Sequence, residues 1–142
     1  MLGMMRLQLI FGIHRATHRI GLYIQSHASD LNQAEAHILC HLHEFGHSTV
    51  ASLHRAFAHR RSTLTSVLDR LDERGWITRE SNLKDRRSFV VQLTAAGKKK
   101  AASIHRLLET LEASALRSTD RQTVAKLNQI IDTVGQTGGL SN

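Results

Sequence analysis

The sequence contains no proline, a single cysteine and only 4% aromatic residues among its 142 positions. Proline is the residue that most strongly interrupts helices, so its absence from a chain rich in Leu, Ala, Arg and Gln favours a mainly helical fold. The one cysteine, Cys40, excludes an intrachain disulfide and favours a reducing compartment. No apolar run is long enough to span a membrane, and Arg6 and Gln8 interrupt the apolar N-terminus. We therefore expect a cytoplasmic protein without a membrane partner.

Basic residues are concentrated in the middle of the chain, which carries a formal net charge of +7. Residues 54–106 contain thirteen Lys or Arg against five Asp or Glu. In residues 1–53 the two signs balance at three each, and residues 107–142 contain four acidic against three basic residues. Charge that serves solubility alone would not be concentrated in this way. The distribution is typical of a protein that binds a polyanion.

Apolar residues recur every three or four positions through most of the chain, which is the spacing of a buried helix face. The pattern predicts six helices, over 4–26, 33–45, 49–58, 62–74, 95–116 and about 119–134. Asn32, followed three residues later by Glu35, is typical of a capping box at the second helix. Four further residues are of types that cap helix ends: Gly46, Ser48, Gly75 and Thr94.

A β-hairpin is expected directly after the fourth helix. WITRE (76–80) and FVVQLT (89–94) are β-prone runs, and the charged loop NLKDRRS (82–88) separates them. Two short helices at 49–58 and 62–74 precede this hairpin and form a helix-turn-helix candidate. The predicted fold class is therefore mainly α with a small β-hairpin wing.

LDRLDERGWITRE (68–80) and KDRRSFVVQLTAAGKK (84–99) resemble the winged helix-turn-helix of the multiple antibiotic resistance regulator (MarR) family. The shared features are a helix ending in D-R-L-x-x-x-G, a D-x-R wing tip and a closing L-T-x-x-G. The resemblance implies a single domain over 1–142, with dimerisation helices in 1–30 and 100–142 and a DNA-binding lobe in 31–97. It further implies a homodimeric transcriptional repressor that binds a pseudo-palindromic operator in double-stranded DNA and is released by a small-molecule effector.

The polar face of the helix at 62–74 is the predicted reading surface. Short hydroxyl side chains let a helix enter the major groove, and arginine can bond guanine. The candidate contacts are Arg60, Arg61, Ser62, Thr63, Thr65, Ser66 and Arg70. The resemblance places the four hydroxyls nearest the bases or adjacent phosphates, and Arg70 on a phosphate. With arginines at its entry, the helix is expected to take Ser62 as its cap. The alternative is a solvated face of ordinary surface charge.

The charged tip of the hairpin is the second predicted contact. A guanidinium on a two-stranded wing can enter the narrow, electronegative minor groove. The resemblance assigns this role to Arg87, with Asp85 as a bracing acceptor and Lys84 and Arg86 near phosphates. Wing, reading helix and central basic block together predict DNA binding.

The ten histidines raise the question of a metal or ligand site. His37, Cys40, His41 and Glu44 offer zinc-binding groups on one helix, but they form no tight ligand motif, so no metal site is assigned. Cys40 is expected to be a small buried residue. The family's effector pocket, carried over by resemblance, would involve His14, His18, Tyr23 and His41.

An enzyme is not expected, because Cys40 and His41 are adjacent on a helix and point about 100° apart. No cofactor is expected either. Two other readings stay open beside the repressor: a zinc-responsive regulator that uses the histidines, and a non-specific architectural DNA-binding protein. Preference for one palindrome over random DNA separates the last of these from an operator-reading protein.

Overall fold

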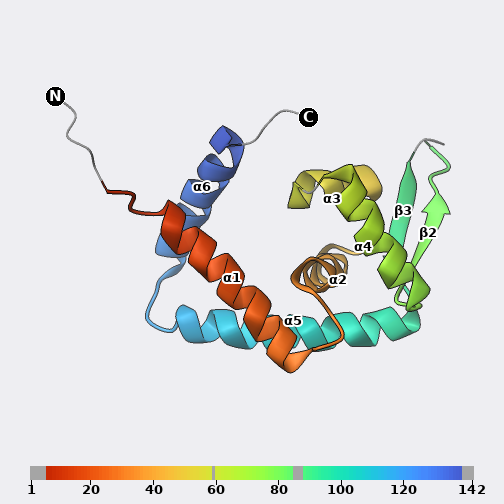
Figure 1. Ribbon diagram of the computed structural model, residues 1–142, viewed down its shortest axis with the longest axis horizontal. Coiled ribbons are helices and arrows are strands. Elements are labelled where there is room, and N and C mark those ends of the chain that lie inside the picture. The colour runs from red at the N-terminus through yellow and green to blue at the C-terminus, as the bar shows by residue number, and fades with distance from the viewer. Residues whose placement is uncertain (1–5, 59, 85–87, 139–142) are drawn as a thin grey trace. The chain divides into compact units, whose positions relative to one another are not determined.

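The computed structural model describes residues 6–58, 60–84 and 88–138, which form helices and one small sheet (Figure 1). In chain order the elements are α1 (Ile10–His27), α2 (Gln33–Phe45), β1 (Ser48–Thr49), α3 (Val50–Phe57), α4 (Arg61–Glu73), β2 (Ile77–Ser81), β3 (Phe89–Leu93), α5 (Ala95–Ala115) and α6 (Arg121–Gly138). The predicted fold class, mainly α with a hairpin wing, is confirmed. None of the helices in the described ranges combines the length and apolarity needed to cross a bilayer.

The chain divides into two compact units, Met1–Leu107 and Leu108–Asn142. The first holds α1 to α4, the sheet and the first part of α5, and the second holds the remainder of α5 and α6. The core of the first unit is aliphatic, and its fully buried members include Ile38, Leu39, Leu53, Leu64, Leu68, Leu71, Ile77 and Val91. These residues come from α2, α3, α4 and both hairpin strands, so α4 and the hairpin are anchored in one core.

The sheet has three antiparallel strands in the order β1-β3-β2. The predicted hairpin is present, and its register pairs Ile77 with Leu93 and Ser81 with Phe89. The strand β1 was not predicted: Ser48 and Thr49 pair with Val91 and Val90. Ser48 is consequently not the cap of α3. That role falls to Thr49, whose hydroxyl accepts a hydrogen bond from the Ser52 amide at 3.0 Å.

Four of the predicted helix ends are confirmed: Asn32, Gly46, Gly75 and Thr94. Asn32 Oδ1 accepts from the Glu35 amide at 2.9 Å, and Thr94 Oγ1 accepts from the Gly97 amide at 3.0 Å. Gly46 and Gly75 have φ of +77° and +73°, the left-handed region in which glycine ends a helix without strain. These positions follow from rules that involve only a few neighbouring residues.

Three helix starts differ from the predictions. The first helix begins at Ile10 rather than near residue 4, with no side-chain cap at Leu9. The reading helix begins at Arg61, so Ser62 lies inside it and is not its cap. The last helix begins at Arg121, where Asp120 Oδ1 accepts from the Thr123 amide at 2.7 Å and fixes the first turn.

A close backbone approach joins the hairpin to α5. The Thr94 amide donates to the Trp76 carbonyl at 3.0 Å, and the Thr94 hydroxyl donates to the Gly75 carbonyl at 2.6 Å. Gly97 lies against Trp76 so closely that a Cβ at this position would overlap the Trp76 carbonyl oxygen. The glycine of L-T-x-x-G is therefore required by the contact between the start of α5 and the turn after α4.

Candidate nucleic-acid interface

The helix α4 has a buried face and an exposed face. Leu64, Val67, Leu68 and Leu71 are at most 2% exposed. The opposite side brings together most of the predicted reading residues, which are all exposed: Arg61, Ser62, Thr63, Thr65 and Ser66. Arg60 is exposed at the N-cap position. The spacing i, i+3, i+4 therefore separated the two faces correctly, because the helix packs on one apolar stripe.

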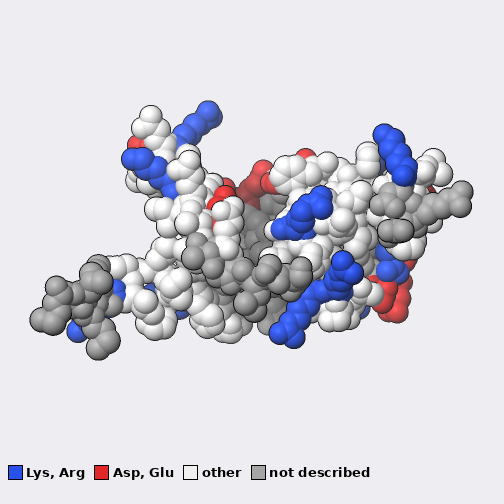
Figure 2. Space-filling view, turned by 90° about the horizontal axis from the view of Figure 1, so that it is seen from above, with Lys and Arg blue, Asp and Glu red and all other residues white. Residues whose placement is uncertain are grey.

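A hollow of about 420 Å³ lies beside the reading face. Its lining includes Arg55 from α3, Arg61 and Thr65 from α4, and Ser88 and Phe89 from the start of β3. Figure 2 shows Lys and Arg side chains projecting from the molecule in the region of α3, α4 and the hairpin. The reading helix and the wing therefore border the same concave surface.

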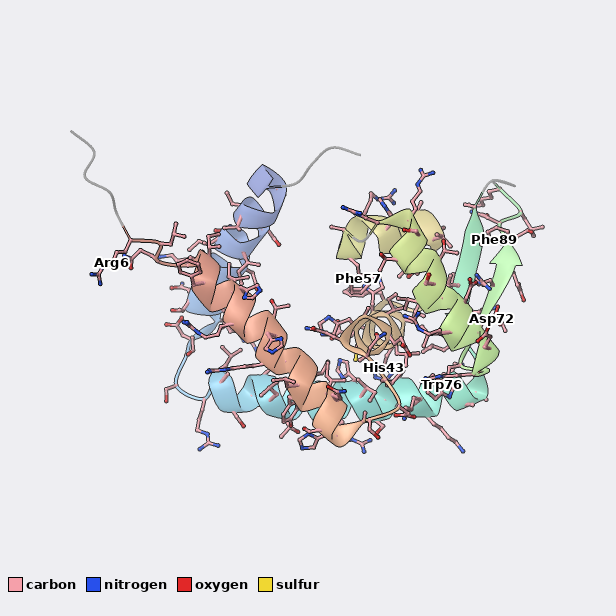
Figure 3. All side chains as sticks on the ribbon, in the orientation of Figure 1. Arg6, His43, Phe57, Asp72, Trp76 and Phe89 are labelled. Carbon is pink, nitrogen blue, oxygen red and sulfur yellow. The ribbon has the colours of Figure 1, made fainter. Side chains whose placement is uncertain are left out.

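Arg79 on β2 ties the wing to the reading helix. Its guanidinium lies 2.8 Å from Asp69 Oδ1 and 2.9 Å from Asp72 Oδ2, both on α4. Figure 3 shows Asp72 on the side of α4 that faces the hairpin. Burial lowers the pKa of Arg79, but hydrogen bonds to Asp72 and Asp69 outweigh it and raise that pKa. Asp69 and Asp72 of the reading helix thus brace the wing and are not ordinary surface charge.

The wing tip is described only at its two ends. The Lys84 amide donates to Asn82 Oδ1 at 3.0 Å, and the Asn82 amide donates to the Ser88 carbonyl at 3.0 Å. Lys84 is exposed, as expected for a phosphate contact. The other predicted wing residues, Asp85, Arg86 and Arg87, lie outside the described residues.

Arg70, the predicted phosphate contact, is hydrogen-bonded to Glu35, which the sequence indicated only as part of a capping box. Its Nε donates to Glu35 Oε1 at 3.1 Å. Arg74, one turn further along α4, places Nη1 3.5 Å from Glu35 Oε2 and donates to the carbonyl of Asp30. The capping box indicated where Glu35 lies along α2 but not that its carboxylate reaches α4.

The predicted effector-pocket residues lie in different surroundings. His18 borders a hollow of about 450 Å³ between α1, the start of α2 and Arg74. Tyr23 packs on His27, with ring centroids 4.3 Å apart. His41 packs against Phe57 at 5.3 Å, and burial lowers its pKa. His14 is exposed on α1. Of these four residues, His18 is the one that lines this hollow.

The four metal-ligand candidates are not assembled as a site. Across the described ranges, no three His, Cys, Asp or Glu side chains converge as a metal ion would require. Glu44 Oε1 lies 2.8 Å from His105 Nε2, and His41 packs on Phe45. Cys40 is half-buried, and burial, with a smaller effect from Glu44, raises the pKa of its thiol to about 12. His37 lies on the same helix, partly exposed.

Comparison with known proteins gives one consistent result. The sequence model of the MarR family matches residues 31–89. The multiple antibiotic resistance protein MarR of Escherichia coli (strain K12) is 27% identical over 106 residues, which is 74% of each chain. A crystal structure of a mutant MarR from E. coli complexed with operator DNA superposes with a TM-score of 0.68 and 26% identity, over 89% of this chain and 90% of that one.

The fold alone is matched still more closely by a more distant protein. S. aureus MepR in its DNA-binding conformation superposes with a TM-score of 0.82 over 90% of this chain and 99% of that one, at 16% identity. The matched segment 31–89 contains the reading helix, β2 and the first residue of β3. This chain is therefore similar to transcriptional regulators of the MarR family, and the family model matches the segment that holds its reading helix.

Proposed function

We propose that this regulator binds double-stranded DNA as a homodimer, represses transcription from a pseudo-palindromic operator and is released by a small-molecule effector. The observation that carries the proposal is the exposed face of hydroxyl and arginine side chains on α4, held beside the wing by Arg79. A helix of this kind fits the major groove, while the wing follows the adjacent backbone and minor groove. The similar protein solved in complex with operator DNA supports binding to DNA.

Each contact has a proposed role. Ser62, Thr63, Thr65 and Ser66 would face base edges or the nearest phosphates, with Arg60 and Arg61 at the entry to the groove. In the wing, Arg87 would enter the minor groove, Asp85 would brace it, and Lys84 and Arg86 would contact phosphates. The 54–106 block of positive charge would supply the sequence-independent part of the affinity.

Exposed apolar side chains support a dimer. On α6, Leu127, Ile130 and Ile131 are 41–49% exposed. At the other end of the chain, large apolar residues around the start of α1 are exposed as well: Leu7, Ile10 and Phe11. A monomer rarely tolerates clustered apolar surface of this kind, and a two-fold dimer matches a palindromic site. Sedimentation equilibrium should therefore give twice the chain mass of 15.9 kDa, whereas the single-chain mass at micromolar concentration would contradict the dimer.

The proposal of release by a small molecule rests on the resemblance to the MarR family. The hollow beside His18 is the part of the first unit in which we would seek such a molecule. A thermal-shift screen of aromatic carboxylates and amines, followed by a DNA-release assay for each hit, tests this part separately. A compound that raises the melting temperature and dissociates the DNA complex supports it; stabilising compounds that all leave the complex intact count against it.

The deciding experiment measures binding to the DNA upstream of the protein's own coding region against scrambled DNA of equal length, across a salt series. Wild type, Arg87→Ala and the control Lys126→Ala, an exposed lysine of α6, are compared. We expect preference for the upstream DNA that Arg87→Ala largely removes and Lys126→Ala keeps. Equal, weak binding to both DNAs, unaffected by Arg87→Ala, would overturn operator recognition and favour the architectural alternative.

A further inference from the structure

Glu35 is unusual in its burial. Among the residues that the structure describes, it is the one charged side chain in the core, with a relative exposure of 3%. It lies in the first turn of α2, and its own amide is bonded to Asn32. An isolated buried carboxylate costs several kcal/mol, so a protein keeps one only where partners compensate it.

Both partners of Glu35 come from the reading helix. Arg70 lies on α4 and Arg74, four residues later, is its C-cap; they approach separate oxygens of the same carboxylate, at 3.1 Å and 3.5 Å. Arg74 is committed to structure: it also donates to the Asp30 carbonyl and lies 5.1 Å from the centre of the Trp76 ring. The pairing with Glu35 therefore fixes the later turns of α4 on α2.

Unlike Arg74, Arg70 keeps the terminal nitrogens of its guanidinium available for a further partner. Its side chain is 42% exposed, and Glu35 engages only Nε. Within the described part of the chain no acceptor is bonded to its two terminal nitrogens. A guanidinium is a rigid planar fork, so holding one edge fixes the direction of the other. The free edge suits a phosphate group.

We propose that Glu35 is a positioning residue for DNA binding, which holds Arg70 by Nε so that its terminal nitrogens are preset to clamp one backbone phosphate. The inference rests on the proposed function, because it assumes that α4 is applied to DNA. Presetting removes the rotamer entropy that a free arginine loses on binding, so the contact gains affinity without touching a base. Glu35 itself touches no DNA.

The sign of the effect distinguishes this role from simple electrostatics. Replacing Glu35 by Gln removes a negative charge near DNA, which by charge alone would strengthen binding. The matched control is Glu73→Gln, which removes the same charge from an exposed position at the end of α4. We expect Glu73→Gln to bind as tightly as wild type or more tightly. Glu35→Gln should bind DNA about tenfold more weakly than wild type. Its slope of log affinity against log salt concentration should be smaller by about one, the change expected for one lost phosphate contact.

The experiment measures affinity for the upstream DNA between 50 and 200 mM salt, roughly the range in which phosphate contacts dominate. If wild type shows no specific binding, the proposed function fails. If wild type binds specifically but Glu35→Gln matches Glu73→Gln in affinity and slope, only the positioning role is overturned. A tenfold loss with the smaller slope, in a protein whose melting temperature lies far above the assay temperature, supports it.

A second variant avoids the buried position, in case Glu35→Gln does not fold. Arg70→Lys keeps the charge at a half-exposed site but removes the planar fork. If Glu35 positions Arg70, the Arg70→Lys variant should lose most of the DNA affinity that Arg70→Gln loses. Binding by Arg70→Lys equal to that of wild type would mean that Arg70 acts as an unpositioned charge, and would overturn the proposal.

Discussion

The contact between Gly97 and Trp76 gives a prediction whose size follows from the geometry. An alanine Cβ at position 97 would overlap the Trp76 carbonyl oxygen and lie 2.7 Å from its carbonyl carbon. Carbon atoms in contact normally stay about 3.5–4.0 Å apart, so the first turn of α5 must move away by about 1 Å. The obstacle is backbone rather than a flexible side chain. The hairpin and α5 therefore cannot both keep their positions.

The movement would break several hydrogen bonds at once. Thr94 donates to the Trp76 and Gly75 carbonyls and accepts from the Gly97 amide. At about 1 kcal/mol for each bond, and with about 1 kcal/mol regained from the helix propensity of alanine, the net cost of Gly97→Ala is about 2 kcal/mol or more. For a chain of this length that lowers the melting temperature by about 5–10 °C.

Thermal unfolding followed by circular dichroism at a fixed protein concentration measures this change. The control is Gly135→Ala on α6, where an added Cβ meets no atom within 4 Å. There we expect a small increase in stability, up to about 1 kcal/mol, from helix propensity alone. A Gly97→Ala variant that melts with or above wild type would refute the steric reasoning.

Three further predictions follow from burial and charge. Leu71→Ala, at a side chain with 0% exposure, should lower the free energy of unfolding by about 2–5 kcal/mol in a urea titration, whereas Leu83→Ala, at 100% exposure, should stay within about 0.5 kcal/mol of wild type. Arg79→Lys keeps the charge but cannot span the two α4 carboxylates, so affinity for the upstream DNA should fall about threefold or more, while the exposed control Arg117→Lys should leave it unchanged; equal affinities would show that the wing needs no brace. The folded protein keeps the Cys40 proton that the unfolded chain releases near pH 9, so stability should fall as pH rises from about 9 to about 12, and that slope should be smaller in Cys40→Ala; identical slopes would contradict a buried thiol.

The features that were predicted correctly from the sequence depend on residues that are close together along the chain. Asn32, Gly46, Gly75 and Thr94 were identified as helix ends because capping involves only three or four residues along the chain. The leucine stripe separated the buried and exposed faces of α4 for the same reason. The hairpin between 76 and 94 was predicted from two β-prone runs around a charged loop, which is also a local pattern.

What the sequence did not reveal depends on contacts between distant segments. The strand at Ser48 is two residues long and exists only because β3 pairs with it from more than forty positions away. The bond between Glu35 and Arg70 crosses 35 positions. In the same way, nothing in the sequence indicated that Asp69 pairs with Arg79, ten positions further along the chain. No local periodicity encodes such pairings.

The proposed function requires that two copies of this chain apply two reading helices to one operator. Hydroxyl-radical footprinting of the wild-type complex on the DNA upstream of its own coding region tests this most directly. We expect two protected blocks related by two-fold symmetry. Their centres should lie about 10–10.5 base pairs apart, or a small multiple of that spacing. A single protected block, or uniform protection that shifts with DNA length, would contradict it.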